Sequence, residues 1–184
     1  YYGEWMKKKA FERIGHLYPK VKDEHGQEHT VIAWIWARTV KCPNPACGCE
    51  MPLASSFELS RRKGKEAYIQ PNINGTSISF EVKTGKKAPK GSIINRKGAR
   101  CLCCDTVLDL DYLREQGSQH KTSVRMLAII AEGINGRLYL SPQQEHSVVA
   151  DIPEPEDAPH GEMPNKALGV NLKAYGFEEH KDLF

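Results

Sequence analysis

Six cysteines in two short clusters constrain the fold of this chain more than any other feature. Three lie in the stretch "CPNPACGC", which begins at residue 42, three lie in "CLCC", which begins at residue 101, and the chain has no others. Residues 1–15 lack the apolar core and cleavage site of a secretory signal. We therefore expect a cytoplasmic protein. In that reducing compartment, clustered cysteines act as metal ligands more often than as disulfides.

One pair of cysteines in each cluster has the spacing of a zinc-binding turn. A structural zinc site takes four thiolate or imidazole ligands in a tetrahedron, usually two from each of two tight turns. The first pair has four residues between its cysteines, and the second pair has two. Gly48 and Asp105 follow these pairs, and both residue types tolerate the left-handed backbone that closes such a turn. The predicted ligands of a structural Zn²⁺ ion are Cys42, Cys47, Cys101 and Cys104.

The other two cysteines, Cys49 and Cys103, do not fit the same turns. One residue between Cys47 and Cys49 is too few for the usual turn, and Cys103 is expected to point away from its neighbour Cys104. We interpret both as packed or semi-exposed thiols. The alternative is a shifted register in which one of them replaces a predicted ligand. In either case four thiolates leave no open position for water, which favours a structural role over metal catalysis.

The remaining pattern predicts an α+β chain with mostly antiparallel β structure. Asn74-Gly75 is a signal for a two-residue hairpin turn. Asp109 and Ser141 are predicted helix caps, and Gly117 is a predicted helix stop. The expected elements are a helix over 4–17, a buried strand over 30–40, hairpins over 66–82 and 125–142, and short helices that begin after Asp109 and Ser141.

The two cysteine clusters then define the expected domain organisation. We predict a zinc-ribbon-like β domain over 28–150, with a long insertion between the two cysteine turns and short flanking helices. We interpret residues 1–19 as a helix that forms the tail of an upstream domain, and 151–184 as an acidic, proline-rich arm. The longest dense apolar stretch, residues 31–37, is the length of a strand, so we expect no membrane partner.

Positive charge is concentrated between the two cysteine clusters. Residues 61–100 contain eleven Lys and Arg but two Glu, a net charge of +9, whereas the whole chain carries +3. A basic block of this size is typical of a surface that binds a polyanion such as DNA, and the alternative is a solvated, loop-rich face. The candidate nucleic-acid-binding residues are Arg61, Arg62, Lys63, Lys86, Lys87, Arg96, Lys97 and Arg100.

The stretch "HGQEH" at 25–29 has the histidine spacing of one class of zinc peptidases. That chemistry requires a helix that places both histidines on one face. Gly26 and the surrounding polar residues oppose a helix here, so we interpret the stretch as exposed loop residues.

Several longer stretches resemble a family of prokaryotic adenine-specific DNA methylases that carry an amino-terminal domain of unknown function. The most specific of them is Trp-Ala-Arg-Thr-Val-x-Cys-Pro, at 36–43. The family's matching cysteines are the four predicted ligands. The stretches that carry the resemblance are "ERIGHLYP" (12–19), "VIAWIWARTVKCPNPACG" (31–48), "GARCLCC" (98–104), "YLREQG" (112–117), "AEGINGRLYLSP" (131–142) and "YGFEEHKDLF" (175–184).

The resemblance implies an accessory module of an enzyme that transfers a methyl group from S-adenosylmethionine to N6 of adenine. That reaction needs an Asp/Asn-Pro-Pro-aromatic motif for the flipped base and a glycine-rich cofactor loop, and this chain contains neither. S-adenosylmethionine would therefore bind elsewhere in the parent protein. The implied partners are DNA and the rest of the methylase polypeptide. The alternative is a purely structural zinc-braced domain, or a protein-docking module, that does not contact nucleic acid.

Overall fold

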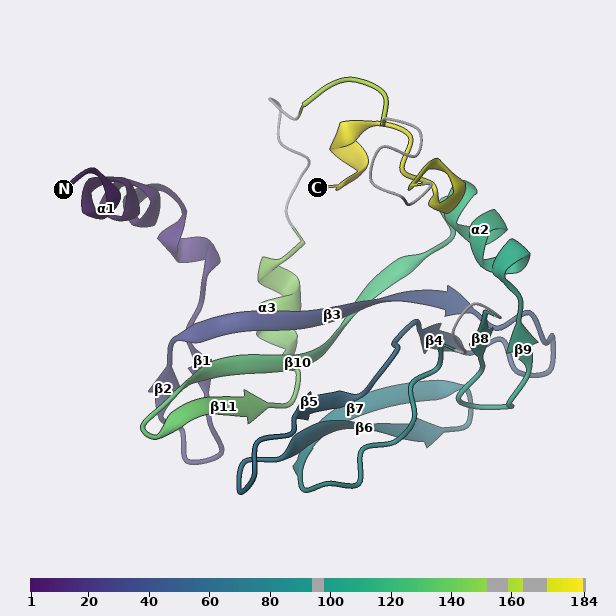
Figure 1. Cartoon of the computed structure of the whole chain (residues 1–184), viewed down its shortest axis with the longest axis horizontal. Helices are drawn as coiled ribbons and strands as arrows, with labels where there is room; N and C mark the ends of the chain where they lie inside the picture. Colours follow the sequence, from purple (N-terminus) through teal and green to yellow (C-terminus); the bar gives the residue numbers. More distant parts are fainter. Residues whose placement is uncertain (94–97, 152–158, 164–171, 184) are drawn as a thin grey trace.

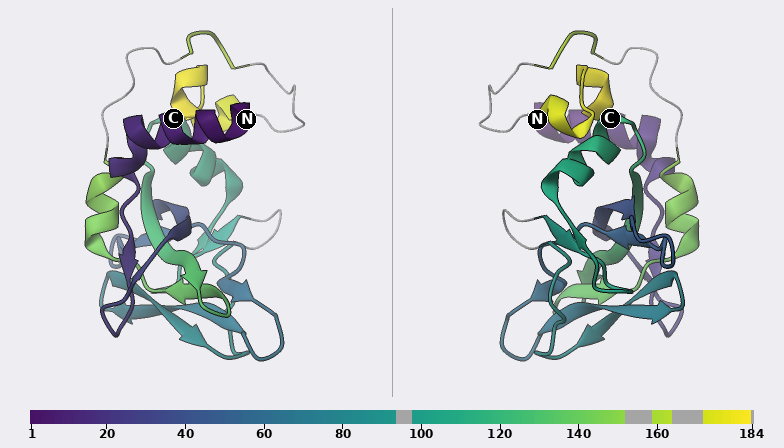
Figure 2. Two further views of the ribbon diagram at one scale, coloured as in Figure 1. Left: turned by 90° about the vertical axis from the view of Figure 1, so that its left-hand side faces the viewer. Right: turned by 90° about the vertical axis from the view of Figure 1, so that its right-hand side faces the viewer.

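The computed structural model describes residues 1–93, 98–151, 159–163 and 172–183. The described chain is α+β, with mostly antiparallel sheets and a few short helices, as the sequence predicts. A four-stranded and a three-stranded sheet form its centre, and two two-stranded ribbons flank them. In Figures 1 and 2 the three-stranded sheet lies beneath the four-stranded one.

The four-stranded sheet is built on the expected apolar strand. Strand β3 (Val31–Lys41) pairs with β10 (Ser123–Gly133) on one side and with β4 (Glu50–Pro52) on the other, and β11 (Gly136–Leu140) completes the order β11-β10-β3-β4. All three pairings are antiparallel. The predicted strand over 30–40 is confirmed as β3. Its β-branched and aromatic residues favour an extended backbone. The β10–β11 hairpin expected within 125–142 is confirmed as well.

The three-stranded sheet contains the second predicted hairpin. It has the order β5 (Glu58–Ser60), β6 (Ala67–Asn74), β7 (Ser77–Thr84). The turn lies one residue later than expected, because Asn74 pairs with Ser77 and the two-residue loop is Gly75-Thr76. Gly75 has φ 61°, so glycine supplies the left-handed residue at the first turn position while Asn74 stays in the ladder.

The main core lies between these two sheets and reaches the cysteines. Among its fully buried side chains are Phe57, Met51 and Ile69, and the same cluster includes Cys42 and Cys101. Both cysteine-bearing loops therefore begin with a residue of the packed core.

A smaller core lies on the other face of β10 and includes Val21 and Ile129. The ladder between β3 and β10 is interrupted between Met126 and Ala128, so Leu127 is an extra residue in β10. Leu127 and Ala128 consequently belong to the main core, while Met126 belongs to the smaller one.

The helices differ from the predictions in their ends. Helix α1 (Tyr2–Ile14) continues as a 3₁₀ turn, η1 (Gly15–Leu17), and buries none of its residues; Figure 1 shows it apart from both sheets. Helix α2 (Leu110–Ser118) is capped by Asp109, whose side chain accepts a hydrogen bond from the Tyr112 N–H at 2.7 Å, as predicted.

Two predicted helix signals have other roles in the structure. Gly117 does not end α2 but lies inside it, where an added Cβ would come within 2.7 Å of the Tyr175 carbonyl oxygen. Helix α3 (Gln144–Val149) follows Gln143, without a side-chain cap. Ser141 is not its cap, because the Ser141 Oγ accepts a hydrogen bond from the Val82 N–H of β7 at 2.9 Å.

The described carboxyl-terminal residues contact α2. They form two 3₁₀ helices, η3 (Leu172–Tyr175) and η4 (His180–Leu183). The Arg38 guanidinium of β3 lies 4.1 Å from the centre of the Phe177 ring, a cation–π contact. Residues 172–183 thus lie against the folded domain through α2 and β3.

The "HGQEH" stretch forms a small ribbon, which excludes the peptidase interpretation. Its last two residues form strand β2 (Glu28–His29), which pairs with the preceding strand β1 (Val21–Lys22), so the two histidines of the stretch do not share a helix face. His29 is not the exposed loop residue we expected, because its side chain is only 9% exposed. Its Nε2 lies 2.9 Å from the Asp23 carboxylate, and its Nδ1–H donates to the Glu132 carbonyl at 2.9 Å.

We expect the Asp23→Asn variant to lose more stability at about pH 5.5 than at about pH 8.5. The hydrogen bond with His29 lowers the pKa of Asp23, and the same bond raises the pKa of His29. The contribution of His29 is complete below its unfolded pKa of about 6.5 and disappears as pH rises through the raised value. The contribution of Asp23 is present above its unfolded pKa and is lost only in acid. Urea unfolding at the two pH values measures the difference.

The control for this prediction is Glu24→Gln, which removes a neighbouring carboxylate on an exposed side chain. It should change stability little at either pH, because the pair that Glu24 forms with His25 at 3.6 Å is exposed to solvent. Equal losses for Asp23→Asn at the two pH values would show that the charged form of the pair does not stabilise the fold.

Candidate metal centre

The two cysteine clusters lie in two hairpin loops that face each other. Residues 42–49 connect β3 to β4, and residues 101–106 connect β8 (Ala99–Arg100) to β9 (Val107–Leu108). Figure 1 shows these loops together at one end of the four-stranded sheet. Each pair of strands is antiparallel, so each loop reverses the chain. Cysteine sulfurs of one loop contact those of the other.

The first loop is held by backbone hydrogen bonds around Asn44. The Cys42 N–H donates to the Cys49 carbonyl at 2.8 Å, and the N–H groups of Cys47 and Gly48 both donate to the Asn44 carbonyl at 2.9 Å. The Asn44 side chain accepts from the Ala46 N–H at 3.0 Å. Gly48 has φ 55°, which confirms the predicted left-handed residue after the second cysteine.

The second loop closes in the same way. The Cys101 N–H donates to the Thr106 carbonyl at 2.8 Å, and the Asp105 N–H donates to the Cys101 carbonyl at 3.0 Å. Asp105 has φ 64°, so it occupies the left-handed position at which glycine is usual. The sequence prediction for this position is also confirmed.

The four predicted ligands come together across these loops. The Sγ atoms of Cys42, Cys47, Cys101 and Cys104 all lie within 4.8 Å of one another. Cys42 and Cys104 are 3.6 Å apart at Sγ, and Cys47 and Cys101 are 3.9 Å apart. In a tetrahedral site with zinc–sulfur bonds of about 2.3 Å the sulfurs are about 3.8 Å apart. The group has the size of a four-thiolate metal site, and all six cysteines are free of disulfides.

The environment of the four sulfurs differs between the core and the surface. Burial raises the pKa of the Cys42 thiol to about 12. Cys104 lies at the exposed rim, where hydrogen bonds from Thr106 lower its pKa to about 6. The Thr106 hydroxyl lies 3.2 Å from the Cys104 sulfur, and the Asn44 amide donates to the same sulfur at 3.8 Å.

Cys49 is buried and Cys103 is half-buried, as the sequence predicts, but sequence reasoning missed that both lie beside other cysteines. Their sulfurs form a second group with those of Cys47 and Cys101, again all within 4.8 Å of one another. Cys49 is 1% exposed, and its Sγ lies 3.4 Å from that of Cys101. A repeated Cys-x-Cys spacing in both clusters was the available signal.

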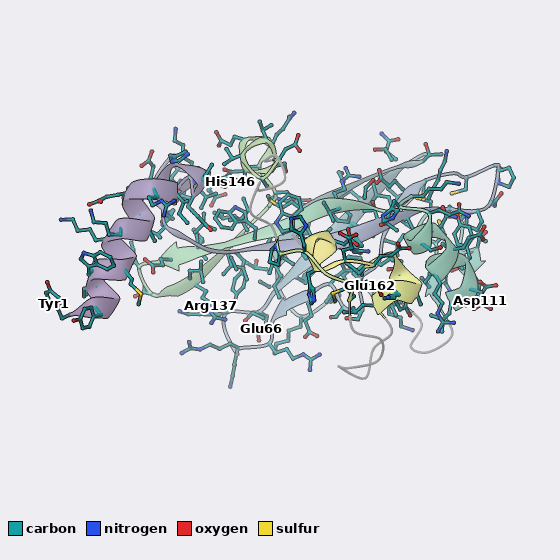
Figure 3. The ribbon with its side chains drawn as sticks, turned by 90° about the horizontal axis from the view of Figure 1, so that it is seen from above. Tyr1, Glu66, Asp111, Arg137, His146 and Glu162 are labelled. Atoms are coloured by element: carbon teal, nitrogen blue, oxygen red, sulfur yellow. The ribbon has the colours of Figure 1, made fainter. Side chains whose placement is uncertain are left out.

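The structure places most of the predicted nucleic-acid-binding residues away from the cysteines. Arg61, Arg62 and Lys63 lie in the β5–β6 loop, and Lys86 and Lys87 follow β7. Both segments lie at the end of the β6–β7 hairpin opposite its turn. In Figure 3, Glu66 marks this basic end and Asp111, on α2, marks the cysteine end, and the two labels lie well apart.

The basic end surrounds a cleft of about 370 Å³. Its lining includes Arg61, Lys63 and Lys86, but also two carboxylates. Glu58 pairs with Arg61 at 2.7 Å, and Glu66 pairs with Lys86 at 3.5 Å. The cleft is therefore of mixed charge.

Of the other three predicted basic residues, the structure describes Arg100. Arg100 lies on β8 beside the cysteines, where its guanidinium pairs with the Asp105 carboxylate at 2.7 Å. Arg96 and Lys97 fall outside the described residues.

Comparison with known proteins finds no family model, no curated protein and no solved structure that matches this chain. In the described part of the chain, no helix has the length and apolar content that crossing a bilayer requires. The geometry of the cysteines and of the basic loops therefore carries the functional argument.

We expect Gly48→Ala to destabilise the metal-loaded protein by about 1–2 kcal/mol, because a Cβ at this left-handed residue is strained. Urea unfolding with a fixed concentration of free zinc measures the change. The control is Gly3→Ala in α1, where nothing lies within 4 Å of the added Cβ and φ is not positive, so stability should not fall. A Gly48→Ala protein as stable as the parent would mean that the first loop adopts another backbone.

Proposed function

We propose that this chain is a zinc-braced accessory module of an adenine-N6 DNA methyltransferase, which contacts DNA through its basic loops. The observation that carries the proposal is the convergence of the four predicted ligand sulfurs from two separate hairpin loops. Zinc is the favoured ion, because tetrahedral sets of four thiolates are typical of structural zinc.

The metal acts here as a brace. It ties the β3–β4 loop to the β8–β9 loop, and the whole three-stranded sheet lies between these loops in the sequence. The ligand sulfurs of Cys42 and Cys101 belong to the main core, so metal binding and core packing stabilise the same state. When bound, the ion supplies charge neutralisation and a cross-link, and no open coordination position for substrate.

The methylase part of the proposal is supported by where the resembling stretches lie. The Tyr112 hydroxyl, in the stretch 112–117, donates to the Lys41 carbonyl at 2.8 Å, next to the first ligand. An added Cβ at Gly176, in the carboxyl-terminal stretch, would come within 2.0 Å of the Gly117 carbonyl oxygen. Three of the stretches that carry the resemblance, 31–48, 112–117 and 175–184, thus contact one another in the fold.

The DNA part of the proposal is supported by the basic end of the small sheet. The Gly85 N–H donates to the Glu66 carbonyl at 2.9 Å, which holds the β5–β6 loop beside the segment after β7. Arg62, Lys63 and Lys87 are exposed there and form no ion pair with a described carboxylate. Unpaired Lys and Arg side chains on adjoining loops are of the kind that contact a phosphate backbone.

A second candidate function is a brace or protein-docking module without nucleic-acid contact. Two observations favour it. Arg61 and Lys86 are already paired with carboxylates, so the basic end is partly neutralised. Helix α1 exposes 54% of Trp5 and 74% of Phe11, apolar surface of the kind that marks a protein contact.

Removal of the metal tests the brace. We expect chelation to lower the melting temperature of the purified protein by about 10 °C or more, because a ligand held at a thousand times its dissociation constant contributes about 4 kcal/mol. Added zinc should restore the original value, whereas added magnesium should not. A melting temperature that is unchanged after verified loss of metal would contradict the structural role.

Fluorescence anisotropy with a labelled DNA duplex tests the nucleic-acid contact. We expect binding that weakens steeply between low and moderate salt. Changing Arg62, Lys63 and Lys87 together to Ala should weaken binding and reduce the slope of log K against log salt by about 3. The matched control changes Lys7, Lys8 and Lys9 on α1 to Ala, which removes the same charge from a distant element. If the folded, zinc-loaded protein does not bind DNA, the DNA contact is overturned and the second candidate function is favoured.

A further inference from the structure

We infer that the six cysteines hold two metal ions as a binuclear cluster, in which the thiolates of Cys47 and Cys101 bridge both ions. This inference rests on the proposed metal site and deepens it from one ion to two. It assigns a role to Cys49 and Cys103, which the single-zinc proposal leaves as thiols beside the site.

The geometry of two overlapping groups carries the inference. The first group contains Cys42 and Cys104, the second contains Cys49 and Cys103, and both contain Cys47 and Cys101. In each group every sulfur lies within 4.8 Å of the others. Two tetrahedra that have two corners in common share one edge. The shared sulfurs here are 3.9 Å apart, close to the edge of about 3.8 Å that zinc–thiolate bonds require.

The two loops contribute equally to such a cluster. Each loop supplies one bridging thiolate and one terminal thiolate for each ion. The first ion takes Cys42 and Cys104 as terminal ligands, with their sulfurs 3.6 Å apart. The second takes Cys49 and Cys103, and the Cys49 sulfur is 3.4 Å from the bridging sulfur of Cys101. The Cys-x-Cys spacing in both clusters places a terminal ligand two residues after each bridge.

Charge balance permits the second ion. One divalent ion with four thiolates has a net charge of roughly −2, and two such ions with six thiolates have the same charge. Loading the second ion converts the thiols of Cys49 and Cys103 to thiolates, forms four metal–sulfur bonds and releases two protons to solvent. No oxidant or reductant is needed. The second ion therefore adds no charge to a region where Cys49 is 1% exposed.

A single ion that exchanges between the two groups is the competing arrangement. The groups share two sulfurs, so without bridging the two sites exclude each other. The competing arrangement predicts one ion per chain and leaves at least two thiols free to react. A binuclear cluster predicts two ions and no reactive thiol until the metal is removed.

The test is the zinc content of the full chain, measured by elemental analysis after removal of loosely bound metal. We expect two zinc ions per chain. Cys49→Ser with Cys103→Ser should hold one, and so should Cys42→Ser with Cys104→Ser. Replacement of both bridging residues, Cys47→Ser with Cys101→Ser, should remove both ions. One zinc in the parent chain and one in the Cys49→Ser/Cys103→Ser variant would overturn the binuclear cluster but leave the single-zinc brace intact. No zinc in the parent chain would overturn both proposals.

A second measurement on the unaltered chain does not depend on whether the variants fold. After exchange of zinc for a spin-active cadmium isotope, NMR should show two metal resonances of equal area, each split by scalar coupling to the other through the shared sulfurs. A single resonance, or two resonances without mutual coupling, would overturn the bridged arrangement.

Discussion

The contact between two hairpin loops across their sulfur atoms is the constraint on which the rest of this structure depends. The loops at 42–49 and 101–106 are each closed by backbone hydrogen bonds and by one left-handed residue, Gly48 or Asp105. The main core fixes the positions of both loops, because Cys42 and Cys101 belong to it. A cation that holds the loops together would therefore also tie the four-stranded sheet, through β3 and β4, to the β8–β9 ribbon.

Much of this arrangement follows from local rules that a sequence displays directly. The strand β3, the two hairpins, the Asp109 cap and the left-handed residues after the cysteine pairs each depend on residues that are neighbours in the chain. The predictions that failed depend on distant partners. Gly117 was expected to end a helix, but it is needed inside α2 because the backbone of Tyr175 approaches it. Ser141 was expected to cap a helix, but its hydroxyl accepts a hydrogen bond from the Val82 N–H at the free edge of β7.

In the candidate site too, local sequence predicts some positions, and others depend on distant partners. The four predicted ligands lie in turns whose cysteine spacing is typical of a tetrahedral zinc site. The structure brings these four cysteines together. Cys49 and Cys103 have no such turn of their own. The repeated Cys-x-Cys spacing was present in both clusters, but it does not say that each of these cysteines lies beside sulfurs of the opposite loop, which the structure shows. The basic residues show a similar limit: one run of charge in the sequence separates in space into the end that contains Lys63 and the rim that contains Arg100.

The long segment between the two cysteine clusters affects how much conformational entropy a metal cross-link would remove from the unfolded chain. A metal that joins Cys47 to Cys101 closes a loop with a sequence separation of 54 residues. In the chain-entropy description of cross-links, a closure of this length removes about 4 kcal/mol of conformational entropy from the unfolded chain. The β5–β6–β7 sheet lies wholly within that loop and contributes no cysteine to the cluster. An ion bound there would therefore stabilise this small sheet without touching it, by limiting how far its two ends can separate when it is unfolded.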